Sequence, residues 1–274
     1  KFFIAGKQAR PDGGTVRPVW NKDGSLAGTV GQGNRKDLRN AVEAAQKASS
    51  WSKSSGHLRA QILFYFAENL SLRRQELESR LQQLLGFKSN EAQQEVDSSI
   101  QRCFHYAAWA DKFEGVLHQP PQGLLVPVLN EPLGVIGLIC PDENPLLSFL
   151  SILLPSLAAG NRSIVIPSPS YPLIANDLIQ VMETSDIPVG AVNLISGNPA
   201  EMIQTLAAHE DLDGIWVFGT EEEVREAKRL STSNLKRVWS NEGQVVDWYS
   251  PAAQGREWLR QASQSKNIWI PFGE

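Results

Sequence analysis

Few side chains in this sequence have both the type and the spacing that chemistry requires. The two cysteines are Cys103 and Cys140. Cys140 ends an apolar run typical of a buried strand, so we expect a packed thiol there rather than a nucleophile. His105 and His118 are near each other in the sequence, but neither has a second ligand at the spacing of a zinc site. The sequence therefore predicts no metal site, and Cys140 is the candidate for thiol chemistry.

Glycine-containing turns before helices are the other candidates, because backbone N–H groups at a helix start can bind phosphate. The Gly-Gln-Gly turn at 31–33 has no buried strand before it and no third glycine after it, so it predicts a plain loop. Gly219 and Thr220 follow an apolar strand and begin a helix, but three glutamates occupy 221–223. These carboxylates favour the positive end of a helix dipole, and they would also repel a diphosphate.

The stretch 131–173 predicts the elements that position these residues. Residues 133–140 are apolar and rich in Val and Ile, as in a strand buried on both faces. Residues 146–159 are apolar almost all round, which predicts a buried helix, and residues 163–166 predict a second strand. A right-handed crossover is the default for such a strand–helix–strand unit.

Helical patterns precede this unit, and alternating strands and helices follow it. Short strands are predicted within 1–30, and amphipathic helices at 37–51, 58–70, 73–85 and 91–113. After the unit, helices are predicted at 171–185 and 197–209, and strands at 192–196 and 212–218. This order predicts an α/β fold class: a twisted parallel sheet with helices on both faces, after a helical N-terminal portion.

Composition excludes several classes of function. The 274 residues are 42% hydrophobic and 20% charged, which is an ordinary globular balance. The net charge of −4 argues against nucleic acid and acidic membranes as partners. Asp142 and Glu143 interrupt the one long apolar stretch, so we expect no membrane span. Two cysteines fit a reducing, cytoplasmic compartment. The chain begins with Lys1, and we expect an excised piece of a longer chain.

The stretch 131–173 resembles the aldehyde dehydrogenase superfamily. Its first turn reads Pro-Asp-Glu-Asn-Pro at 141–145 where active members read Pro-Trp-Asn-Phe-Pro. Its helix ends in Leu-Ala-Ala-Gly-Asn at 157–161, which matches the family's Leu-Ala-x-Gly-Asn. The match continues through most of the chain. The resemblance implies a Rossmann-like cofactor-binding domain with a helical N-terminal portion, and a catalytic domain that is mostly missing.

The catalytic positions implied by the resemblance carry altered residues. Glu143 stands where the family has an Asn that stabilises an oxyanion, and a carboxylate there would repel that charge. Asn241 stands at the general base, and an amide cannot accept a proton near neutral pH. A one-residue slip would place Glu242 there instead. The family's nucleophilic cysteine lies well downstream, and no cysteine follows Cys140. We therefore predict no catalytic residues and a pseudoenzyme rather than an enzyme.

The cofactor positions implied by the resemblance are altered too. Ile166 and Pro169 replace the Lys and Glu that hold the adenosine ribose, and neither side chain can hydrogen-bond. Pro199 replaces the second glycine of a turn that approaches the cofactor, and it removes an N–H group. Three positions keep the family's residue type: Gly197, Gly219 and Thr220. On balance we predict that no cofactor is bound, with NAD as the less favoured alternative.

The remaining segments bear on partners. Residues 116–131 resemble a shortened form of the hairpin with which family members reach a neighbouring subunit, and their apolar edge needs cover. Residues 261–274 resemble a much later family segment. The truncated second half and altered motifs together resemble the C-terminal pseudo-domain of two-module family 16 aldehyde dehydrogenases. We therefore predict one truncated domain over 1–274, partnered by another aldehyde-dehydrogenase-like module, a copy of itself or other proteins.

The function predicted from these residues is a structural, oligomerisation or protein-interaction module. Three alternatives stay open. The chain could be a dinucleotide-binding sensor, or part of an NAD-dependent aldehyde dehydrogenase whose chemistry lies in another module. It could also be an active dehydrogenase that uses Cys140.

Overall fold

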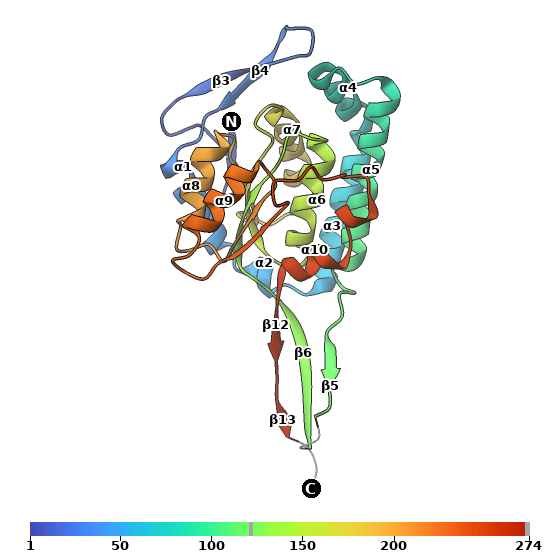
Figure 1. Ribbon diagram of the computed structural model, residues 1–274. Helices are drawn as coiled ribbons and strands as arrows, with labels where there is room; N and C mark the ends of the chain where they lie inside the picture. The colour runs from blue at the N-terminus through green and yellow to red at the C-terminus, as the bar shows by residue number, and fades with distance from the viewer. Residues whose placement is uncertain (121–122, 272–274) are drawn as a thin grey trace.

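A sheet with helices on both faces forms the body of the molecule (Figure 1). The computed structural model describes residues 1–120 and 123–271. The sheet has seven strands in the order β11-β10-β7-β8-β9-β1-β2. Its parallel strands are β7 (Val135–Ile139), β8 (Arg162–Ile166), β9 (Val192–Leu194), β10 (Gly214–Val217) and β11 (Arg237–Ser240). β1 (Phe2–Ile4) and β2 (Lys7–Ala9) add an antiparallel edge. This architecture confirms the predicted α/β fold class.

The helices divide between the two faces of the sheet (Figure 1). One face packs against α1 (Arg35–Lys47), α8 (Pro199–Ala207) and α9 (Glu221–Leu230). The other packs against α6 (Pro145–Ala158) and α7 (Pro172–Glu183), with α3 (Gly56–Leu72), α4 (Arg74–Leu85) and α5 (Ser89–Trp109) outside them. Along β7, Val135 and Ile139 join the first core, whereas Ile136 and Leu138 join the second. Burial on both faces explains why β7 is continuously apolar.

The unit β7-α6-β8 is buried throughout, as its sequence predicts. Every residue of both strands and of α6 is buried. After the helix, the Asn161 side chain fixes the return of the chain. Its Oδ1 accepts a hydrogen bond from Gly134 N at 2.9 Å, and its Nδ2 donates to Ser156 O at 3.1 Å. Asn161 thus holds the helix end beside the start of β7, so that β8 enters the sheet next to it.

The segment after β11 closes one side of the body. It contains a short 3₁₀ helix (Pro251–Ala253) and α10 (Arg256–Gln261). The buried Arg102 guanidinium of α5 donates to Trp248 O at 2.9 Å and to Ala253 O at 2.6 Å. Asn161 Nδ2 also donates to Ala262 O at 2.8 Å. Because buried side chains satisfy these carbonyls, the segment is part of the core rather than a loose tail.

A narrow stalk of strands projects from the body, and a two-stranded hairpin lies at the opposite end (Figure 1). The stalk contains β5 (Val116–His118), β6 (Leu124–Pro132), β12 (Ser263–Asn267) and β13 (Ile270–Pro271). β6 pairs antiparallel with all three of the others. The hairpin predicted at 116–131 corresponds to β5 and β6, and its residues 121–122 lie outside the described residues. The opposite hairpin is β3 (Val16–Trp20) and β4 (Leu26–Gly31).

Candidate functional site

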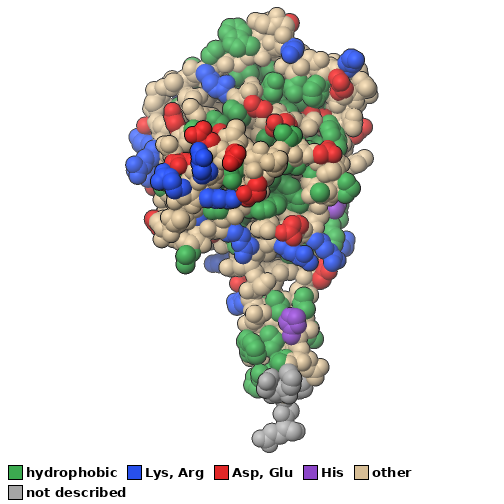
Figure 2. Space-filling view, in the orientation of Figure 1, with side chains coloured by type: hydrophobic (Ala, Val, Ile, Leu, Met, Phe, Trp, Pro, Cys, Tyr) green, Lys and Arg blue, Asp and Glu red, His purple; other side chains and the backbone are tan. Residues whose placement is uncertain are grey.

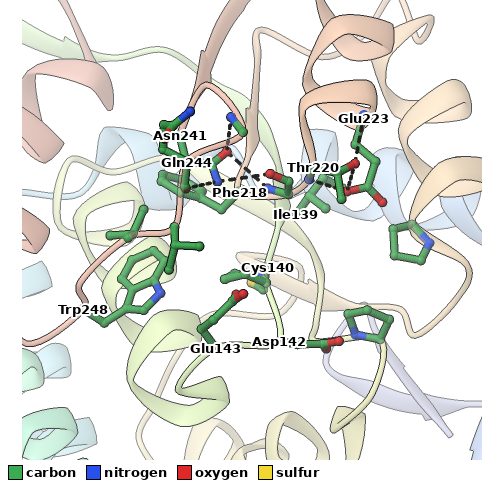
Figure 3. A pocket seen from close by; sticks show the side chains of 17 residues that line it. Ile139, Cys140, Asp142, Glu143, Phe218, Thr220, Glu223, Asn241, Gln244 and Trp248 are labelled. Atoms are coloured by element: carbon green, nitrogen blue, oxygen red, sulfur yellow. Dashed lines mark hydrogen bonds between the residues drawn. The ribbon is translucent and has the colours of Figure 1, made fainter.

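A cavity of about 330 Å³ lies at the carboxyl ends of β7, β10 and β11 (Figure 3). In open parallel sheets, ligands bind at this edge, where loops and helix N-termini meet. The turns after these strands and the segment around residue 246 form its walls. The lining residues are Ile139, Cys140, Pro141, Asp142, Glu143, Pro169, Pro199, Phe218, Gly219, Thr220, Glu223, Asn241, Gly243, Gln244, Val245, Val246 and Trp248.

The thiol groups of Cys103 and Cys140 are both buried in the protein. Cys140 is 3% exposed, and its backbone N–H donates to Ile166 O at 2.9 Å, which fixes it at the end of β7. Cys103 is fully buried on α5. Burial raises the pKa of each thiol well above its usual range. Because the thiolate is the nucleophilic form, neither sulfur is poised for attack near neutral pH.

Asp142 joins the turn after β7 to the turn after β8. Its carboxylate accepts hydrogen bonds from Ser168 Oγ, from Ser170 N at 2.9 Å and from Ser170 Oγ at 2.6 Å. The Arg17 guanidinium, from the β3 strand, donates to the neighbouring Pro169 O. Asp142 is therefore engaged within the protein, and it fixes the position of Pro169 on the cavity wall.

Glu143 is the exposed carboxylate of the same turn. It makes no hydrogen bond or ion pair with another residue in the described ranges. The next residue, Asn144, has a positive φ of 45° and donates from Nδ2 to Glu95 at 3.2 Å and to Tyr249 Oη at 3.3 Å. These bonds fix the turn that presents Glu143 to the cavity.

Glu95, which the sequence analysis did not single out, holds the start of α6. This α5 side chain is fully buried, and its carboxylate accepts from Leu146 N at 2.9 Å and Leu147 N at 3.3 Å. Those N–H groups have no partner within the helix, so a carboxylate there satisfies them and complements the helix dipole. Burial raises the pKa of the Glu95 carboxyl.

The Asn241 side chain links the turns that follow β10 and β11. Its Nδ2 donates to Gly219 O at 3.1 Å and to Gln244 O at 2.7 Å, while its Oδ1 accepts from Gly219 N at 3.3 Å. Glu242, which a one-residue slip would place at the general base, instead pairs with Lys228 at 2.5 Å on the surface. Asn241 lines the cavity and Glu242 does not. The structure thus places the amide in the site.

The start of α9 is capped by its own side chain. Glu223 Oε2 accepts from Thr220 N at 2.9 Å and from Thr220 Oγ1 at 3.2 Å, and Thr220 Oγ1 accepts from Glu223 N at 3.3 Å. This is a reciprocal capping box. A Cβ at position 219 would lie 2.3 Å from Glu223 Oε2, so a larger residue there would displace this carboxylate from the cap. An internal carboxylate therefore rests on the helix end that could otherwise bind an anion.

The structure gathers most of the predicted site positions but not all of them. Glu143, Pro169, Pro199, Gly219, Thr220 and Asn241 line the cavity. Ile166 is fully buried in the sheet core, and Gly197 lies against Met202 of α8. Neither of these two lines the cavity. Ile166 instead serves packing, and Gly197 allows the close approach of α8, because a Cβ there would lie 2.9 Å from Met202 Sδ.

An aromatic cluster backs the cavity, and the sequence analysis did not predict it. Trp248 is 1% exposed and packs against Phe218, with ring centroids 5.5 Å apart. Trp258 stacks on Phe218 at 5.3 Å, and Trp239 contacts Trp258 at 4.6 Å. Such pairs add to the free energy of burial. Three tryptophans within 239–258 were the signal for this wall.

Within the described ranges, no helix combines the length and apolar character that a membrane crossing needs. In the same part of the chain, no three His, Cys, Asp or Glu side chains form a group that could hold a metal ion.

Comparisons with known proteins find aldehyde dehydrogenases. The chain is 30% identical over 243 residues to betaine aldehyde dehydrogenase of Bacillus subtilis, which is 86% of this chain and 49% of that protein. It is 29% identical over 247 residues to aldehyde dehydrogenase 1A1 of Equus caballus. The structure of PnpE from Pseudomonas sp. WBC-3 superposes with a TM-score of 0.84 at 28% identity, covering 88% of this chain and 50% of that one. The chain spans about half the length of the relatives it matches.

These findings correct two predictions. We predicted that the chain is not an enzyme, yet its relatives are aldehyde dehydrogenases, and nothing in the structure shows that it lacks activity. We predicted that no cofactor is bound, yet similar structures were solved with NAD: PnpE, and betaine aldehyde dehydrogenase of Staphylococcus aureus (TM-score 0.83, 24% identity). The cofactor prediction gave too much weight to single side chains such as Ile166 and Pro169. The prediction of a pseudoenzyme rested in the same way on Glu143, Asn241 and the absence of a later cysteine. A sheet crevice and a helix N-terminus are backbone features that survive such changes.

The match to the family extends over most of the sequence. The family model for the aldehyde dehydrogenase family covers residues 9–244. It ends near Gln244, so the aromatic cluster is completed by residues beyond the matched range. The predicted superfamily is confirmed at this level, and the chain belongs to the aldehyde dehydrogenase family.

Proposed function

We propose that this chain is the dinucleotide-binding portion of an NAD-dependent aldehyde dehydrogenase whose nucleophile comes from another module. The observation that carries the proposal is the cavity at the carboxyl ends of β7, β10 and β11, into which the N-terminus of α9 opens. The names of the relatives and the similar structures solved with NAD support the same proposal. NAD, when bound, supplies a hydride acceptor.

The cavity offers a dinucleotide mainly backbone groups and apolar walls, and few side-chain contacts. Gly219 lets a diphosphate approach, and Thr220 offers its N–H and hydroxyl once Glu223 turns away to solvent. Pro169 and Pro199 give an apolar wall for a nucleoside. Because no side chain replaces the family's ribose contacts, we expect a dissociation constant on the order of 100 μM, about −5.5 kcal/mol.

The nucleophile is placed in another module because both thiols of this chain are buried with raised pKa values. The resemblance to the C-terminal module of two-module family 16 aldehyde dehydrogenases supports a second module in the same polypeptide. Dinucleotide sensing is the second candidate function. It is favoured by Asn241, because an amide cannot accept a proton near neutral pH and this one is held by hydrogen bonds to Gly219 and Gln244.

The experiment for this function is a calorimetric titration of NAD⁺ into the chain and into Gly219→Ala. An added Cβ at 219 would displace the flexible Glu223 carboxylate at little cost, but it would also occupy the space through which a diphosphate approaches the backbone, so we expect at least a tenfold loss of affinity. Gly28→Ala is the control, because its Cβ would meet Leu173 at an ordinary 3.5 Å on remote β4. No heat with millimolar NAD⁺, or equal binding by Gly219→Ala, would overturn the proposal.

We also propose that the stalk is the surface that meets another aldehyde-dehydrogenase-like module or a second copy of this chain. Figure 2 shows hydrophobic side chains gathered along it, and Leu117 and Trp269 are 63% and 62% exposed. β12 and β13 cover one edge of β6 from within the chain, but β5 and β12 leave outer edges open to pairing.

Sedimentation velocity tests the stalk proposal. Trp269→Ser should lower the fraction of dimer, because the substitution removes a large exposed apolar side chain from the stalk. Leu72→Ser is the matched control, since Leu72 is 85% exposed on the body and should leave association unchanged. A monomeric wild-type chain would refute self-association, and co-sedimentation with an aldehyde dehydrogenase module would then decide between the remaining partners.

A further inference from the structure

The cavity has a strongly one-sided charge. Three carboxylates line it, those of Asp142, Glu143 and Glu223. Within the described ranges, no lysine, arginine or histidine side chain lines it. A ligand that enters this cavity therefore meets negative charge with no opposite charge on the lining to offset it, and apolar walls strengthen the interaction.

Two of the three carboxylates are already engaged. Asp142 accepts three hydrogen bonds from Ser168 and Ser170, and the charge of Arg17 acts near it. Glu223 accepts two from Thr220 at the positive end of α9. Glu143 has no such partner in the described part of the chain. Its charge is therefore the one left to act on a ligand.

Glu143 lies away from the helix end where a diphosphate would rest. In Figure 3, Glu143 and Trp248 lie across the cavity from Thr220 and Glu223. Cys140 and Trp248, which line the cavity beside it, are 3% and 1% exposed. Glu143 itself is exposed, so water and salt screen its charge, and it acts on a ligand group only at close range.

The two oxidation states of a nicotinamide dinucleotide differ in charge at one ring. The oxidised nicotinamide is a cation and the reduced ring is neutral, while the diphosphate is common to both. With the diphosphate at α9, the prolines at 169 and 199 suit an uncharged nucleoside. The wall with Glu143 and Trp248, across the cavity from Thr220 and Glu223, suits a cation (Figure 3). Repulsion from Glu223 acts on both states equally, so it cancels from their ratio.

We propose that Glu143 makes this cavity selective for the oxidised over the reduced dinucleotide. The inference rests on the proposed function, because it requires dinucleotide binding. Close contact between this exposed carboxylate and a unit positive charge corresponds to a preference of about fivefold, or about 1 kcal/mol. The preference depends on charge, so it should decrease as salt screens the carboxylate.

The test is a calorimetric comparison of NAD⁺, NADH and ADP-ribose on the full chain, Glu143→Gln and Glu222→Gln. We expect NAD⁺ to bind about five times tighter than NADH, and the ratio to fall near one in Glu143→Gln. ADP-ribose lacks the nicotinamide, so its affinity should change little in that variant. Glu222 is exposed on α9 outside this cavity, and Glu222→Gln removes the same charge, so this variant should keep the roughly fivefold ratio.

Each other outcome overturns a distinct claim. Equal binding of NAD⁺ and NADH by the wild-type chain refutes the selectivity and leaves the proposed function standing. A preference that persists in Glu143→Gln refutes the assignment to Glu143. Absence of binding by all three ligands refutes the proposed function, and the selectivity falls with it.

Discussion

The N-termini of α6 and α9 border the same cavity, and each is capped by a glutamate in a different way. On α6 the carboxylate is Glu95, which comes from α5 and is fully buried. On α9 it is Glu223, which belongs to the helix itself and is partly exposed. A buried cap from a separate helix cannot leave without unpairing its donors. A local cap at the surface can rotate into water.

The difference indicates that one helix end is structural and the other is available to a ligand. Glu95 accepts from two backbone N–H groups and from Asn144, so removing it leaves several donors without a partner. Glu223 can exchange its bonds to Thr220 for bonds to water at small cost. The site therefore combines a fixed turn at 142–144 with an exchangeable anion position at 219–220.

The largest effect should come from Glu95→Ala. Loss of the carboxylate leaves the buried backbone N–H groups at the start of α6 without a partner. Each buried unsatisfied group costs on the order of 1–3 kcal/mol. We expect the free energy of unfolding to fall by about 3 kcal/mol, measured by urea unfolding followed by tryptophan fluorescence. Glu68→Ala is the control, because Glu68 is exposed on α3 and surface changes stay within about 0.5 kcal/mol. A loss no larger than that of the control would mean that water replaces Glu95 and that α6 is not fixed in the way described.

The contrast between the two caps also shows what the sequence could and could not reveal. The acidic start of α9 was readable because capping by Glu223 is local, three residues from Thr220. The role of Glu95 was not readable, because its partner Leu146 lies 51 residues away and no local pattern marks such a bond. The unit β7-α6-β8 was predicted because burial on both faces leaves a continuous apolar run.

The remaining site residues also depended on information that lies outside the local sequence. The choice between Asn241 and Glu242 needed the register of β10 and β11, in which Val217 lies opposite Ser240. Trp248 could not be placed because it follows the family match, which ends at residue 244. The prediction that no cofactor binds was wrong for a related reason: it counted lost side chains, whereas the crevice is formed by the backbone.

The smallest effect on stability, and the sharpest for function, should come from Glu223→Ala. Loss of a local cap costs about 0.5–1 kcal/mol of unfolding free energy. It also frees the N–H and hydroxyl of Thr220 and removes a negative charge from the diphosphate position. We expect the affinity for NAD⁺ to rise about threefold to tenfold in calorimetry, and that for NADH to rise equally.

Glu222→Ala is the matched control for this change, because it removes a carboxylate from the same helix turn without touching Thr220. Unchanged NAD⁺ affinity in Glu223→Ala would place the diphosphate elsewhere and remove the contrast between the two helix ends. A rise for NAD⁺ alone would instead assign to Glu223 the selectivity that we give to Glu143. Equal rises leave the two carboxylates with separate roles: one competes with the diphosphate, and the other distinguishes the charge of the ring.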